Sequence, residues 1–168
     1  MANKQSFTPD EWLKVTESTA VVGMAVTAAD PSGLWGMLKE ALAGGTMIAA
    51  IKEDPNANEL VKAVISDLET KDARKALQEA LRKRFSGAKP ADVVPRSLEL
   101  LREVSRILDA KAPADAPAFK AFLNEIAAKV AEATKEGGFL GFGGVPVSDA
   151  EKATLAQIAE ALGTPPQA

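Results

Sequence analysis

Apolar residues recur at intervals of three and four along almost the whole chain, and this period limits the fold more than any other feature. The interval matches the turn of an α-helix, on which such positions share one face. Residues 119–130 show it clearly, with Phe119, Phe122, Leu123, Ile126 and Val130. No stretch of useful length alternates with the period of two that a half-buried strand requires. The sequence therefore predicts an all-α protein.

Helix start and stop signals divide this pattern into about seven or eight helices. Thr8, Pro9 and Glu11 have the residue types of a helix start with a capping box, and the helix should run to about Ala29. Its second half is apolar nearly all round, which is typical of a helix at the centre of a bundle. The other expected helices occupy about 34–42, 47–53, 60–68, 71–85, 98–108, 119–130 and 149–162.

The expected connections follow the prolines and glycines. Residues 86–95 and 109–117 are predicted to be connections, and 1–7 and 164–168 to be loose tails. Ser148 and Glu151 form a second capping box, and Gly163 ends the last helix. Because this punctuation is only local, we expect one domain over 1–168, a helical bundle with a Gly/Phe-rich loop before the last helix.

Composition excludes several kinds of chemistry. The chain has no Cys and no His, which removes thiolate and imidazole nucleophiles, bases and metal ligands. The redox compartment is therefore not indicated. A net charge of −3 and few aromatic residues argue against nucleic-acid binding. The N-terminus shows no signal-peptide pattern and no run is long enough to span a membrane, so a cytoplasmic location is expected.

The run from Glu136 to Glu151 is the most distinctive segment. It interleaves five glycines with large apolar residues, namely Gly137, Gly138, Phe139, Leu140, Gly141, Phe142, Gly143 and Gly144. Neither the P-loop nor the dinucleotide fingerprint fits, because Gly144-Val145 follows where Lys-Ser/Thr belongs and Pro146 takes the place of the third glycine. A packed structural loop, a protein-interaction surface and a small-ligand site all remain open.

The C-terminal layout resembles the TerB-like helical family, which is associated with tellurite resistance and stress response. Val147-Ser148-Asp149-Ala150-Glu151 and Leu162-Gly163 match the family pattern, whereas Thr134-Lys135-Glu136-Gly137 replaces its Ala-Asp-Gly turn. The resemblance implies binding of a divalent cation through acidic turn residues, here Asp30 and Glu136. Helix-end and turn chemistry explains both residues as well. The loop is also similar to EGGFLGFGG loops of bacterial proteins, a resemblance that implies no activity.

Three functions stay open. The first is a non-catalytic helical protein that binds another protein or itself, with Phe139, Phe142 and Trp35 as anchors. The second is a TerB-like, metal-binding stress protein. The third is a carboxylate-dependent enzyme, for which Asp10 with Glu11 and Glu53 with Asp54 are the candidate pairs.

A basic run closes the helix expected over 71–85. Arg82, Lys83 and Arg84 could bind an acidic partner. Cations near a helix C-terminus also interact favourably with the helix dipole, which gives the run a purely structural explanation.

Overall fold

The structure is a computed structural model that describes residues 1–29, 57–136 and 147–165, and only the backbone of 133–136. These residues form one short 3-10 helix and six α-helices. Their bounds are η1 Lys4–Ser6, α1 Pro9–Ala29, α4 Glu59–Leu68, α5 Lys71–Arg84, α6 Pro90–Lys111, α7 Ala116–Glu136 and α8 Asp149–Leu162. The all-α prediction is confirmed for this part of the chain. The two helices expected over 34–42 and 47–53 lie outside it.

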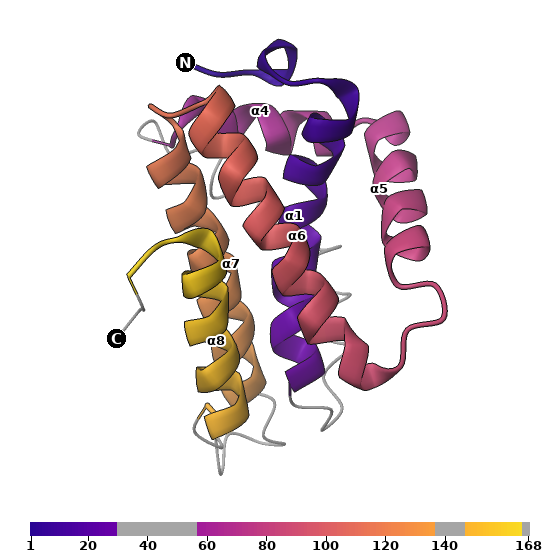
Figure 1. The fold of residues 1–168 in the computed structure, drawn as a ribbon, viewed down its shortest axis with the longest axis vertical. Helices are drawn as coiled ribbons and strands as arrows, with labels where there is room; N and C mark the ends of the chain where they lie inside the picture. Colours follow the sequence, from indigo (N-terminus) through magenta and orange to yellow (C-terminus); the bar gives the residue numbers. More distant parts are fainter. Residues whose placement is uncertain (30–56, 137–146, 166–168) are drawn as a thin grey trace.

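The first long helix, α1, stands at the centre of the molecule, as its apolar second half predicts. It packs against α4, α5, α6, α7 and α8. Figure 1 shows α6, α7 and α8 gathered around it, α4 across one end and α5 on the outside. Val15, Val21, Val22, Ala25 and Val26 of α1 are completely buried. Burying each valine favours the folded state by about 1.5–3 kcal/mol, so α1 organises the core.

Helices α6, α7 and α8 each contribute one buried face to this core. Leu100, Leu101 and Val104 lie on that face of α6, and Phe119 and Leu123 on that of α7; all are 0% exposed. The last helix, α8, adds its own apolar face and packs against both α6 and α7. The periodic apolar positions therefore predict the buried faces well, because one face of a helix is all that a bundle needs to bury.

The expected caps are present at both ends of the chain. Thr8 N–H donates to Glu11 Oε2 at 2.8 Å, and Thr8 Oγ1 accepts from Glu11 N–H at 3.3 Å. Ser148 and Glu151 exchange the same two bonds at 2.8 and 3.2 Å. Gly163 follows α8 with a left-handed φ of 68°, a conformation that suits glycine. Each cap satisfies backbone groups that the helix leaves unpaired.

The predicted connections are too long, because the prolines do not end the helices there. α6 begins at Pro90, where the missing N–H costs nothing, and continues through Pro95. It then runs to Lys111, and α7 begins at Ala116. The connections expected over 86–95 and 109–117 thus shorten to 85–89 and 112–115. The free energy gained by burying the apolar face of α6 offsets the cost of the hydrogen bond that Pro95 cannot donate.

Residues 1–7 are not the expected loose tail. Ala2 is 9% exposed and Phe7 is 7% exposed, and the Phe7 ring packs 5.7 Å from the Trp12 ring between centroids. The amide of Ala2 donates to Asp115 Oδ2 at 2.7 Å, and Lys4 binds Asp67 at 2.8 Å. The segment is therefore tied to both α4 and the turn before α7.

Thr164 is likewise anchored rather than frayed. Its N–H donates to the Ala159 carbonyl, and its hydroxyl accepts from Asn124 Nδ2 at 2.8 Å. The tail beyond Pro165 lies outside the described residues.

Candidate functional site

The residues that the sequence singled out for function lie mainly outside the described part of the chain. This holds for the loop from Gly137 to Gly144 and for Asp30. Glu136 is the last residue of α7, but its side chain is not described. The assignments of the candidate metal ligands and of the Gly/Phe loop therefore stay predictions.

The candidate catalytic carboxylates at the start of α1 have structural partners. Glu11 accepts from the Thr8 backbone in the capping box, and this bond lowers the pKa of the Glu11 carboxyl. Asp10 pairs with Lys14 at 2.7 Å. Their side chains therefore serve different neighbours. The other candidate pair, Glu53 and Asp54, lies beyond the described ranges.

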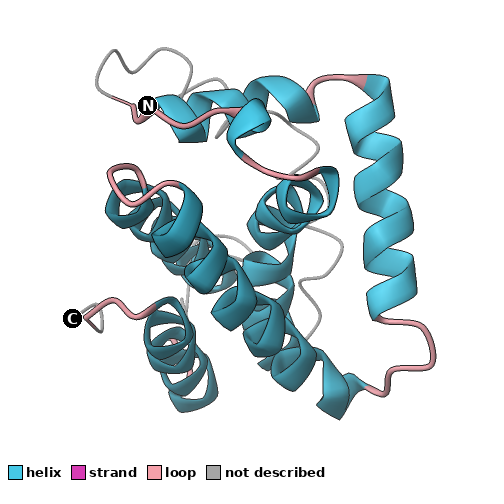
Figure 2. Cartoon of the chain, turned by 45° about the horizontal axis from the view of Figure 1, so that its top comes forward, coloured by secondary structure: helices cyan, strands magenta, loops and turns pink. Residues whose placement is uncertain are grey.

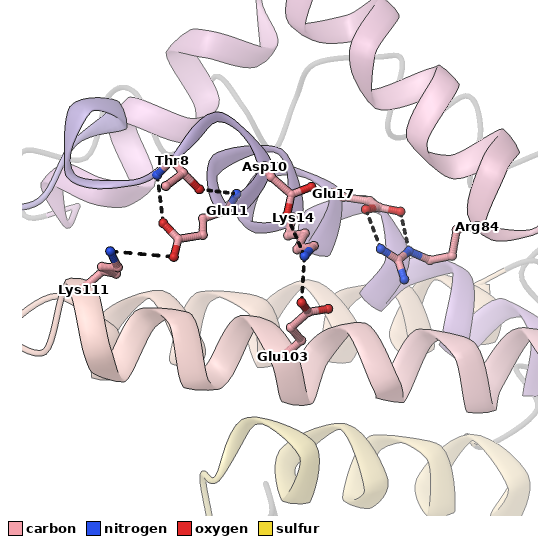
Figure 3. A network of polar contacts seen from close by, with 8 residues as sticks. All are labelled: Thr8, Asp10, Glu11, Lys14, Glu17, Arg84, Glu103 and Lys111. Atoms are coloured by element: carbon pink, nitrogen blue, oxygen red, sulfur yellow. Dashed lines mark hydrogen bonds and ion pairs between the residues drawn. The ribbon is translucent and has the colours of Figure 1, made fainter.

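Polar contacts run from α1 to the neighbouring helices, as Figure 3 shows. Lys14 reaches Glu103 of α6 at 2.7 Å, and Glu11 lies 3.8 Å from Lys111 near the end of the same helix. The two hydrogen bonds of Lys14, to Asp10 and to Glu103, raise the pKa of its ammonium group. These contacts fix the alignment of α1 against α6.

The most deeply buried ion pair joins α1 to α5. Glu17 is 1% exposed, and its two carboxylate oxygens accept from Arg84 Nε at 2.6 Å and Arg84 Nη2 at 3.0 Å. This two-bond geometry raises the pKa of Arg84. Figure 3 shows the guanidinium and the carboxylate facing each other between the two helices. Arg84 therefore fastens α5, and only the rest of the basic run is available to a partner.

The remaining buried ionisable groups are also engaged. Asp115 accepts from Ala2 N–H at 2.7 Å and from Asn58 Nδ2 at 2.8 Å, and the backbone bond from Ala2 does most to lower the pKa of its carboxyl. The Lys120 ammonium donates to both oxygens of Asp109 at 2.7 and 2.8 Å. Such pairing is what buried charges require, and it gives each group a structural role.

Two hollows open on the described surface. One of about 500 Å³ lies beside Lys120, Asn124 and Thr164, whose polar groups bond to Asp109 or to one another. The other, of about 370 Å³, is lined by Trp12 and Asp67 among others. Trp12 Nε1 donates to Asp67 Oδ2 at 2.7 Å there. Polar side chains in both hollows bond to neighbours within the protein.

Within residues 1–29, 57–136 and 147–165, no three or more acidic side chains gather as a metal site would require. No helix there is long and apolar enough to cross a membrane.

Helix α5 differs from every other described α-helix because none of its residues is buried. It stands at the outside of the molecule in both views (Figure 1 and Figure 2). Leu81, together with Phe85 just beyond the helix, is partly buried and packs against the core. Lys71, Arg74, Lys75, Arg82 and Lys83 are exposed. α5 is thus a basic, amphipathic helix fixed to the body on one side only.

No family model matches this chain, and neither does any curated protein or solved structure. The resemblance to TerB-like proteins, with its link to stress response and metal binding, stays a prediction. Among the described residues, the candidate site is the exposed, basic face of α5.

Proposed function

We propose that this chain is a non-catalytic helical protein that works by associating with another protein or with a second copy of itself, and that α5 is its docking element. One observation carries the proposal. An outlying helix with no buried residue presents five exposed cations, and none of their side chains has an ion-pair partner among the described residues. Elsewhere, buried charges that the structure describes have partners within the protein.

The charge distribution supports a docking role for α5. The helix carries six cationic and two acidic residues, a net charge of +4, so the rest of the chain carries −7 against the total of −3. A concentrated charge of sign opposite to that of the whole protein steers an approaching partner toward one face. The sequence shows the basic run at residues 82–84, and the structure adds Lys71, Arg74 and Lys75 as exposed cations of the same helix.

Site-specific photocrosslinking in cells tests this function. A photoreactive amino acid replaces the exposed Gln78 on α5 in one variant and the exposed Glu132 on α7 in the control. We expect discrete protein adducts from position 78 that are absent from position 132, with an adduct of twice the chain mass if the partner is a second copy. If position 78 gives no adduct above that of position 132, α5 is not a docking element.

A further inference from the structure

The exposed cations of α5 form a line rather than a scattered set. Lys71, Lys75 and Arg82 follow one another at spacings of four and seven, which places them along one side of the helix. Arg74 is the neighbour of this row at the i+3 spacing, and Gln78 lies between the cations. We call Lys71, Arg74, Lys75 and Arg82 the basic stripe. From residue 71 to residue 82 it extends over about 17 Å at 1.5 Å per residue.

The stripe faces away from the protein body. Arg84 reaches inward to the buried Glu17, and Leu81 and Phe85 pack against the core. The half-buried residues Ala76, Leu77 and Ala80 belong to the same inward side. The four cations of the stripe are exposed, and none of their side chains is paired within the described chain. A partner can therefore reach them without any rearrangement of α5.

We propose that the basic stripe binds a short acidic segment of a partner protein. This proposal rests on the docking function proposed for α5. Carboxylates spaced along about three helical turns of the partner match the length of the stripe, and Arg74 and Arg82 can each donate two N–H groups to one carboxylate. Gln78 in the middle of the row can donate to a carboxylate or to a peptide carbonyl.

A membrane surface fits this helix less well. An amphipathic helix that binds lipid buries its apolar face in the headgroup and acyl boundary. The apolar face of α5 is turned toward α1 and is fixed there by the bond between Arg84 and Glu17. Only the polar face meets the outside, so α5 has no apolar side chains to insert.

A nucleic acid also fits less well. A duplex is a long polyanion that carries one charge per about 1.7 Å of its axis, and it would extend past the ends of the stripe. Beyond α5 the chain carries a net charge of −7, and Asp72 and Glu79 lie beside the stripe on α5 itself. Repulsion from this acidic remainder selects a ligand whose negative charge is confined to a short segment.

Binding of synthetic peptides to the full chain tests the proposal. The probe is a fluorescent 16-residue peptide with glutamates at spacings of three and four, and its control carries glutamine at the same positions. Anisotropy titrations at low and at about 0.15 M ionic strength should show binding of the glutamate peptide only, weakened by salt. Equal binding of the glutamine peptide would overturn the proposal.

Two variants of equal net charge assign the binding to the stripe. The test variant replaces the four stripe residues with glutamine, and the matched control replaces four other exposed cations with glutamine, namely Arg102, Arg106, Lys129 and Lys152. Because the test variant loses four exposed ion pairs with the peptide, its affinity should fall by at least roughly fourfold, whereas that of the control variant should not. An equal loss in both variants would show a diffuse charge effect and reject the stripe.

Two competitors decide between classes of partner. A 16-base-pair DNA duplex and vesicles containing phosphatidylserine should bind the chain more weakly than the glutamate peptide. Tighter binding of either would replace the acidic protein segment with that class. If the glutamate peptide fails while position 78 still crosslinks to a protein, the docking function stands and only the acidic chemistry is wrong. If the peptide binds and position 78 gives no adduct in cells, the proposed function fails instead.

Discussion

Replacing Arg84 with methionine should destabilise the protein more than any other single change on α5. The substitution keeps the length of the apolar stem but leaves the Glu17 carboxylate, 1% exposed, without its two hydrogen bonds. Removing one partner of a buried ion pair costs about 3–5 kcal/mol. Because the Arg84 side chain is 23% exposed, some water can reach the gap, and we expect a value near about 3 kcal/mol.

A double variant separates the loss of the ion pair from the loss of packing. Methionine at both positions 17 and 84 replaces the pair with apolar side chains of similar size, a change that is often neutral or stabilising. We therefore expect the double variant to be more stable than Arg84→Met alone by about 2 kcal/mol or more. Urea unfolding followed by circular dichroism measures the free energies of unfolding. Arg82→Met is the matched exposed control, and its free energy of unfolding should lie within about 0.5 kcal/mol of that of the parent.

The result that refutes this reasoning is specific. If Arg84→Met costs less than about 1 kcal/mol, Glu17 is hydrated or has another partner, and the pair does not hold α5. Hydrogen exchange gives an independent measurement, because loss of the pair should release the amides of α5 before those of α6.

Three further changes test other contacts. Asp115→Asn should lower the melting temperature at neutral pH. The folded-state pKa of Asp115 lies below its ordinary value of about 4. The ionised carboxylate therefore stabilises the fold above about pH 4, and this stabilisation is lost as pH falls through the folded-state pKa. The difference from the parent should therefore shrink in acid, and a constant difference would contradict the assignment. Gly23→Ala should stabilise by about 0.5–1 kcal/mol in urea unfolding, because its Cβ would lie at an ordinary 3.5 Å from Val130 Cγ2 and alanine favours the helix interior. Destabilisation would mean that α1 and α7 approach too closely there. Ser148→Ala should cost about 1 kcal/mol by the same assay, while Ser148→Thr keeps the cap and most of the stability. Equal losses in the two variants would argue against the cap.

Local signals predicted the helices and their caps because both depend on residues close in sequence. The two capping boxes join residues three positions apart, and Gly163 needs only the left-handed conformation that follows a helix. The prolines misled the prediction for the same reason. Pro90 and Pro95 favour a break when only their neighbours are considered, whereas the buried face of α6 decides in favour of a helix.

Contacts between distant residues could not be predicted in this way. Asp115 bonds to Ala2, which is 113 positions away, and no local pattern links the two. Glu17 did carry a signal, because a charged residue between Val15 and Val21 on a central helix needs a partner. The identity of that partner, Arg84, depends on how α5 folds back onto α1. The basic stripe became visible only when burial showed which face of α5 is outward.

The central position of α1 has a consequence for the chain during its synthesis. Helix α1 lies in the N-terminal part of the chain, whereas its main partners, α6, α7 and α8, come later. At about 5–20 residues per second, α1 waits roughly 5–20 s before α7 is complete. For much of that interval its valines lack the native cover that α6, α7 and α8 provide. A nascent chain of this protein is therefore most exposed to aggregation, and most in need of a chaperone, before its second half has been made.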